Sequence, residues 1–210
     1  MEYEEARYHP PTSKAPAGHV CLIGATTGRI CSRWGARERS FVRSCTRVAN
    51  GYHWHLHAYV VMSNHCHLAV ETPLGNLSAE MHYLQSVFSN RFNKFVGERG
   101  HVFQDRYKAL VLEDETALLQ VVDYIHLNPV RAGLVRMEDL KVYPLSSFPV
   151  FFRGKERPKF LDSAEFLPEA GGLSDSPAGM GACHRRLKLV MEEDPAKRDT
   201  WATPTPPPGK

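Results

Sequence analysis

The sequence has no apolar run long enough to cross a membrane. A membrane-spanning helix needs about 18 or more consecutive apolar residues, and no stretch of this 210-residue chain approaches that length. The first residues, MEYEEARYHPP, are acidic and contain no apolar segment. They do not have the pattern of a secretory signal. We therefore expect no membrane partner.

Paired cysteines are also missing. The five cysteines are odd in number and include no CxxC pair, which argues against a disulfide framework and against a structural zinc site. Free thiols are typical of a reducing compartment, so the sequence favours a cytoplasmic protein.

The chain has little excess of basic charge. The net charge is +3, but residues 1–51 carry 8 basic and 4 acidic side chains, residues 52–137 carry 7 and 8, and residues 138–210 carry 11 of each. Charge alone therefore does not indicate a nucleic-acid enzyme. The length and a hydrophobic content of 42% fit one globular domain with extensions.

Histidine is concentrated in one stretch, from Tyr52 to Glu71, which holds five of the eleven. Apolar residues alternate there with histidines, a pattern that predicts two strands, each with one buried face, joined by a turn at Ser63-Asn64. His65 and His67 then project from one face, about 7 Å apart at the backbone. Two interpretations stay open at this point: a cation site, or a surface strand that is rich in histidine.

Other elements follow from periodicity. Residues 1–28 have no sustained pattern, and an Arg-rich helix is expected over about 36–49, with either a solvated face or phosphate contacts. An amphipathic helix begins after Asn76, with its apolar stripe at Leu77, Met81, Leu84, Phe88, Phe92 and Phe95, and ends near Gly97 or Gly100. A strand is expected over 107–113. A helix capped by Asp114 runs to Asn128, where Pro129 disfavours further helical geometry.

Three motifs resemble those of the single-tyrosine HUH transposases, and in particular the branch of REP-associated tyrosine transposases. They are MSNHCHLAVETP, GHVFQDRYKALVLED and YIHLNPVRAGLV, in this order within residues 52–148. The resemblance implies an α+β fold, an antiparallel sheet with helices on both faces, like the ferredoxin-like palm of HUH nucleases. A sheet flanked by helices also fits the order of the expected elements.

The spacing of Tyr124 and Asn128 puts both on one face of their helix. Packed against the histidine face of the sheet, they would converge with His65 and His67, and two imidazoles with an amide oxygen suit Mg²⁺ or Mn²⁺. The resemblance implies the reaction: Tyr124 attacks single-stranded, hairpin-associated DNA and forms a 5′-phosphotyrosine, with the metal on His65, His67 and Asn128. The metal or His126 is expected to activate the phenol, whereas His126 and His57 are otherwise interpreted as structural hydrogen-bonders.

The resemblance also indicates Gln104, Arg106 and Lys108 as polar residues that help to hold the nucleic acid, and simple solvent exposure is the alternative. Further candidates for DNA contact are Arg91 and Lys94, on the outward face of the amphipathic helix, and Arg131. The resemblance is also compatible with a homodimer.

The resemblance does not extend over the first 50 residues, where the expected opening strand is interrupted by Pro10-Pro11. We predict a divergent segment over 1–51, left by a reading-frame disruption or by replacement, which would leave an unpaired sheet edge and a poorly stable protein. The catalytic domain is expected over 52–148, followed by a loosely structured extension over 149–210 with a disordered Pro-rich end.

Two other functions compete with the enzyme. One is a protein, or an inactive transposase remnant, that binds structured single strands by stacking and phosphate contacts without cutting them. The other is a zinc-dependent hydrolase built on the same histidines, although the sequence has no HExxH motif.

Overall fold

Four antiparallel strands form one sheet in the order β2-β3-β1-β4. The structure is a computed structural model, and it describes residues 19–26, 41, 43–45, 47, 48, 51, 53–97 and 99–193. The strands are β1 (His19–Thr26), β2 (His55–Val61), β3 (His65–Thr72) and β4 (Lys108–Val111). The predicted α+β class with an antiparallel sheet is confirmed.

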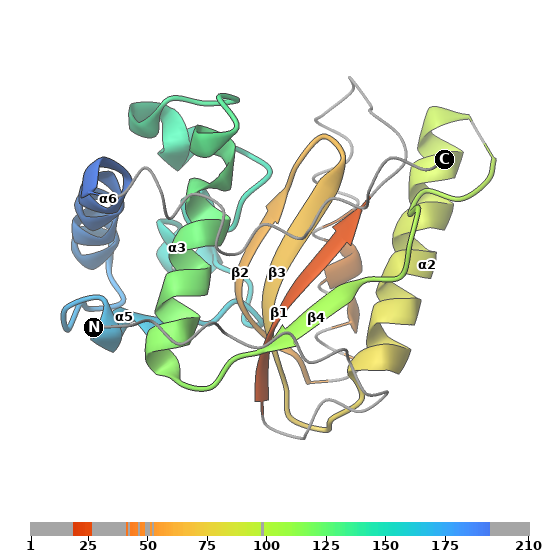
Figure 1. The fold of residues 1–210 in the computed structure, drawn as a ribbon, viewed down its shortest axis with the longest axis horizontal. Coiled ribbons are helices and arrows are strands. Elements are labelled where there is room, and N and C mark those ends of the chain that lie inside the picture. Colours follow the sequence, from red (N-terminus) through yellow and green to blue (C-terminus); the bar gives the residue numbers. More distant parts are fainter. Residues whose placement is uncertain are drawn as a thin grey trace.

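The helices lie on both sides of this sheet (Figure 1). On one side is α2 (Leu77–Val96), and on the other is α3 (Glu115–Arg131). Residues 41, 43–45, 47, 48 and 51 are helical as well, and the Phe41 ring contacts both Tyr59 of β2 and Phe88 of α2. The strand order and the succession of strands and helices are those of a ferredoxin-like βαββαβ unit.

The central strand is β1, which corrects our expectation of an irregular segment over residues 1–28. Residues 19–26 pair with β3 on one side and with β4 on the other. Cys21 and Ile23 are completely buried. The edge beside the histidine strand is therefore filled, and the expected cause of instability is absent from this sheet. The Pro10-Pro11 pair lies outside the described residues.

Strand β2 departs from the strict alternation that we predicted. A bulge between Leu56 and Ala58 leaves His57 as an extra residue, so the side chains before and after it change faces. Leu56 pairs with Val70, whereas Val60 pairs with His67 on the opposite face. Both faces are buried, because helices cover each of them, as the predicted fold requires, so the alternation does not mark a strand with a single buried face.

The two long helices begin and end close to the predicted positions. Asp114 accepts a hydrogen bond from the Ala117 amide at 2.7 Å, as expected of a cap. Asn76 occupies the cap position of α2 but makes no side-chain capping hydrogen bond. Helix α2 ends at Gly97, whose φ of 73° favours glycine. Phe95, predicted to be part of the apolar stripe, is 51% exposed.

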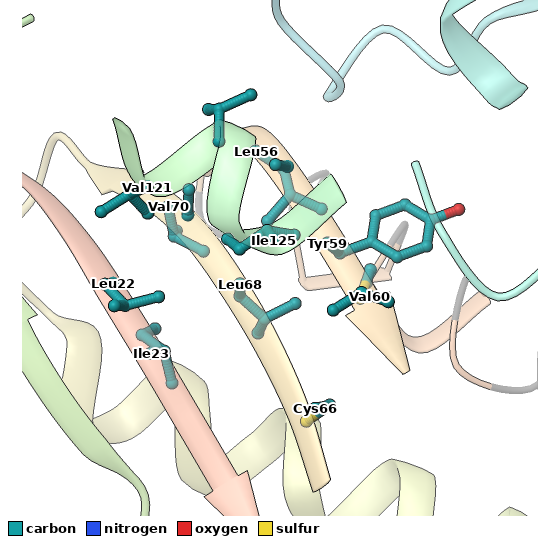
Figure 2. Close-up of a cluster of buried hydrophobic side chains, with 14 of the residues drawn as sticks. Leu22, Ile23, Leu56, Tyr59, Val60, Cys66, Leu68, Val70, Val121 and Ile125 are labelled. Atoms are coloured by element: carbon teal, nitrogen blue, oxygen red, sulfur yellow. The ribbon is translucent and has the colours of Figure 1, made fainter. Parts of the chain in front are cut away.

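Helix α3 continues past the predicted end at Asn128 and contains Pro129. The proline lies in the last turn. The helix loses one amide donor there, but backbone hydrogen bonds from the residues that follow stabilise its end. The amides of Ala132, Gly133 and Leu134 donate to the carbonyls of Asn128, Val130 and Pro129. Val121 and Ile125, from the middle of α3, lie over β2 and β3 (Figure 2).

The region after residue 147 is folded, in contrast to the loosely structured extension that we predicted. It contains α4 (Phe148–Phe151), α5 (Phe166–Glu169) and α6 (Pro177–Glu193), together with the short 3-10 helix η2 (Gly154–Glu156), which follows η1 (Met137–Val142). Phe160, Leu161 and Leu187 from this region are buried in the core. The Pro-rich end lies outside the described residues.

The outer edge of β2 is covered by this same region. The Leu56 amide donates to the Phe160 carbonyl at 2.8 Å, and the Asp162 amide donates to the Leu56 carbonyl at 2.9 Å. The four cysteines in the described part of the chain are free and buried, as predicted from their spacing. None of the helices in the described ranges combines the length and apolar character that crossing a bilayer requires.

Candidate active site

Strand β3 places His65 and His67 on one face of the sheet, because they are two residues apart. Their ring centroids are 4.9 Å apart. His67 pairs with Val60 of β2 and with Gly24 of β1, so it lies in the interior of the sheet and is only 2% exposed.

Helix α3 brings Tyr124 and Asn128 to this face. The Tyr124 hydroxyl oxygen and Nε2 of His67 are 3.2 Å apart and share a hydrogen bond, and the two ring centroids are 5.2 Å apart. The Asn128 side chain, one helical turn further, hydrogen-bonds His65. The four side chains converge as predicted, although β3 and α3 are far apart in the sequence.

Burial keeps both imidazoles neutral. It lowers the pKa of His67 to about 3, with a further contribution from the neighbouring His65. Burial also lowers the pKa of His65, while the hydrogen bond with Asn128 opposes this change. A neutral imidazole has a free lone pair, and this is the form that accepts a hydrogen bond or binds a metal.

These donors fit a divalent cation. Nδ1 of His67 is buried and has no hydrogen-bond partner, so the ring is not committed to a purely structural network. Nδ1 of His65 donates to Oδ1 of Asn64 at 2.8 Å, which orients that ring. Two imidazoles and the amide oxygen of Asn128 are ligands that Mn²⁺ accepts, and Mg²⁺ accepts the amide oxygen readily.

His126 lies on another face of α3. Its Nε2 is 3.0 Å from the Ser147 hydroxyl oxygen, which also accepts a hydrogen bond from the Tyr59 amide. The imidazole is completely buried, and burial lowers its pKa to about 3. His126 is therefore a structural hydrogen-bonder that links α3 to β2, as we interpreted it.

His57 does not match the interpretation as a structural hydrogen-bonder. It is completely buried, yet neither of its ring nitrogens makes a hydrogen bond. Its nearest charged neighbour is Glu165, with Nε2 and Oε2 3.5 Å apart.

Three of the residues predicted to contact DNA lie beside the histidines. The Arg131 guanidinium is 5.8 Å from the centre of the Tyr124 ring. Lys108 pairs with Gly24, which in turn pairs with His67, so Lys108 and His67 share a face with only a glycine between them. The backbone amide of Gln104 donates to the backbone carbonyl of Thr26, the residue of β1 that pairs with His65.

Of the other three predicted residues, two lie on the far side of the sheet. Arg91 and Lys94 belong to α2, which covers the opposite side of the sheet (Figure 1). Arg106 is exposed in the loop before β4. The structure thus groups Arg131, Lys108 and Gln104 with the histidines and does not bring Arg91 and Lys94 to them.

Residues 29–128 match the sequence model of the family described as "Transposase IS200 like". This part of the chain is similar to the IS200-like transposases. The matched segment contains all four converging residues. It begins earlier than the resemblance that we expected over 52–148, and it ends at Asn128.

The fold is similar to that of a solved REP-associated tyrosine transposase bound to a REP hairpin. The TM-score is 0.55 at 16% sequence identity, and the similarity covers 78% of this chain and 92% of that one. At this identity the likeness shows a common fold. Among curated proteins, no sequence matches this chain significantly.

Proposed function

We propose that this protein is a DNA strand transferase that cleaves and rejoins single-stranded, hairpin-associated DNA. The observation that carries the proposal is the contact between the Tyr124 hydroxyl and His67, with His65 and Asn128 beside them. The structural neighbour is a REP-associated tyrosine transposase bound to a REP hairpin. The common fold supports the choice of substrate and of the REP-associated branch.

Tyr124 would act as the nucleophile. Its oxygen forms a bond to the phosphorus of the scissile phosphodiester, the bond between phosphorus and the 3′ oxygen breaks, and the phenol proton ends on the released 3′ hydroxyl. The product is a 5′-phosphotyrosine. Because the new ester retains the phosphoryl group, attack by a 3′ hydroxyl reverses the step and rejoins the strand without a nucleotide cofactor.

The surrounding residues would orient the phosphate. His65, His67 and Asn128 would hold a divalent ion, Mg²⁺ or Mn²⁺, which when bound polarises a phosphate oxygen. The hydrogen bond between Nε2 of His67 and the phenol oxygen fixes the direction of the Tyr124 oxygen in the resting site. Arg131 and Lys108 add positive charge on the same face.

Covalent capture tests the proposal. The protein is incubated with a labelled single-stranded hairpin and Mn²⁺, and the products are separated on a denaturing gel. We expect a covalent adduct with the unaltered chain and a loss of at least about three orders of magnitude in Tyr124→Phe. DNA affinity in a shift assay should change less than about two-fold, because the ring and its packing remain.

Two matched controls are Tyr107→Phe and Tyr143→Phe, which keep Tyr124. An adduct that persists in Tyr124→Phe and disappears in one of the controls would move the nucleophile to that control position. A band shift without any adduct for the unaltered chain would favour the protein that binds hairpins without cutting them. The cytoplasmic location and the homodimer stay predictions.

A further inference from the structure

A second group of potential ligands lies on the same face of the sheet, away from His65 and His67. His57 of β2, Glu71 of β3 and Glu165, the residue before α5, each offer one ligand atom, and these atoms lie within 4.8 Å of one another. Glu71 is four residues from His67, which is about 13 Å along a strand. The two groups are therefore separate sites.

His57 lies beside Glu71 on the sheet. His55 pairs with Glu71, and His57 is two residues further along β2, the spacing that puts two side chains of a strand on one face. His57 is also the extra residue of the bulge between Leu56 and Ala58, so it has no pairing partner on β3.

Among the described residues, the imidazole of His57 has no hydrogen-bond partner to account for its burial. It is completely buried, and within this part of the chain both ring nitrogens are without a hydrogen bond. An unsatisfied buried polar group costs about 1–3 kcal/mol, so a native protein ordinarily pairs it. The atoms nearest to it in this group are carboxylate oxygens, and a cation between them would satisfy both sides.

The charges around the group also favour a cation. Burial raises the pKa of Glu165, and the negative charges of Glu71 and Asp162 raise it further. Burial lowers the pKa of His57 to about 4, so its ring is neutral at pH 7 and can act as a ligand. A divalent ion would relieve the repulsion between the carboxylates without requiring a proton on His57.

The group has a second layer and a path to solvent. Nδ1 of His55 and Oε2 of Glu71 are 2.8 Å apart, which orients that carboxylate. The Glu165 side chain is 42% exposed and the Glu71 side chain 18%. An ion can therefore enter from the Glu165 side, with His57 at the closed end.

We propose that His57, Glu71 and Glu165 form a second divalent-cation site, with one imidazole nitrogen and carboxylate oxygens as ligands and water completing the shell. This donor set suits Zn²⁺ or Mn²⁺. The site joins β2 and β3 to the segment that leads into α5. Its role is to fasten the C-terminal helices to the sheet, independently of DNA cleavage.

The test uses the full chain with His65→Ala and His67→Ala, so that the candidate active site cannot bind the probe. After chelator treatment and dialysis, this variant is titrated with ZnCl₂ by calorimetry. We expect one ion per chain, and a rise in Tm of about 5 °C at a zinc concentration 100 times Kd. Adding Glu165→Gln should weaken binding at least ten-fold, which at the same zinc concentration reduces this rise in Tm by about half or more.

The matched control is Glu169→Gln, an exposed glutamate one turn along in α5, which should leave zinc binding unchanged. No binding in the double histidine variant would overturn the proposal, and so would equal affinity in the Glu165→Gln and Glu169→Gln variants. If the double histidine variant does not fold, the two glutamine substitutions are made in the unaltered chain. Only Glu165→Gln should then remove one ion from the stoichiometry. Zinc binding is read without DNA, so failure here leaves the proposed transferase function untouched.

Discussion

Tyr124 is held by a contact that would have to change in the proposed reaction. Its side chain is only 6% exposed, and its hydroxyl shares a hydrogen bond with Nε2 of His67. For Tyr124 to act as the proposed nucleophile, a phosphodiester would have to displace neighbouring side chains to reach the phenol oxygen. Arg131, which lies over the Tyr124 ring at the end of α3, would be one neighbour able to contact that phosphate.

The two histidines of the candidate active site should matter more than the asparagine. We expect His65→Ala and His67→Ala each to lower adduct formation by about two orders of magnitude, the cost of removing one group that stabilises the developing charge. Asn128→Ala should have a milder effect, of about ten-fold, because water replaces an amide ligand. Calorimetry with Mn²⁺ should rank the variants in the same way, with the affinity lowered more in the two histidine variants than in Asn128→Ala. Unchanged Mn²⁺ affinity in both histidine variants would remove this metal site.

His126 should make the protein sensitive to acid. Its pKa falls from 6.5 to about 3 on folding, so between these values the unfolded chain binds more protons than the folded one. Stability is therefore complete above pH 6.5 and falls as the pH drops through this window. Lowering the pH from 7 to 5 should cost about 2 kcal/mol through this group.

Urea unfolding at pH 7 and pH 5 measures this loss. His126→Gln should reduce the difference between the two pH values, because the variant cannot take up the proton. His82→Gln, at an exposed position of α2, controls for the loss of a histidine. An equal pH dependence in the His126→Gln variant and the unaltered chain would show that His126 is not the titrating group.

How much of each site the sequence could reveal depended on spacing. His65 and His67 are two residues apart on a strand, and Tyr124 and Asn128 are one turn apart on a helix, so each pair shares a predictable face. The group of His57, Glu71 and Glu165 has no such local pattern. It depends on Glu165, which lies in a C-terminal segment that returns to β2, and such a return leaves no periodic signal.

At the scale of the elements, β1 decides whether the sheet is complete. It contributes the strand between β3 and β4, and Ile23 at its centre is fully buried. Without it, β4 would be separated from the histidine strand, and Lys108 would lose its position beside His67. The stability of this one strand is thus linked to the geometry of the candidate active site.

Ile23→Ala should lower the free energy of unfolding by about 3 kcal/mol, because it leaves a cavity in the centre of the sheet. Val111→Ala is the control on β4, where the side chain is 40% exposed, and it should cost less than about 1 kcal/mol. Denaturant melts compare the two. A cost for Ile23→Ala no larger than that of the control would mean that β1 contributes little to the core.

The elements that the sequence predicted well are the ones with a sustained period. The stripe of α2 and the capped start of α3 follow from spacing over several turns. Strand β1 has the sequence HVCLIGAT, a short apolar run buried on both faces, and such a run has no alternation to detect. Helices α4 and α5 are four residues each, too short for a helical period to appear.

At the scale of the whole molecule, the C-terminal region completes the side of the sheet that holds both sites. The rings of Phe148 and Phe151 contact His126 of α3, with centroids 5.1 and 5.9 Å away. Arg186 of α6 forms an ion pair with Asp123 at 2.5 Å. Burial raises the pKa of Asp123 to about 7, and Arg186 opposes this change. Helix α3 is therefore held between the sheet and the C-terminal helices.

A chain truncated after Ser147 should lose its cooperative thermal transition. The truncation removes the ion-pair partner of Asp123 and the Phe160 carbonyl that accepts from the Leu56 amide, and it exposes the buried outer side of α3. Since native domains are stable by only about 5–15 kcal/mol, the loss of these contacts exceeds what the sheet can tolerate. A chain truncated after Glu193 retains every one of these contacts and is the control. Calorimetry that shows the same sharp transition for both truncated chains would mean that residues 52–147 fold with β1 alone, and that the C-terminal helices are an addition to the catalytic domain.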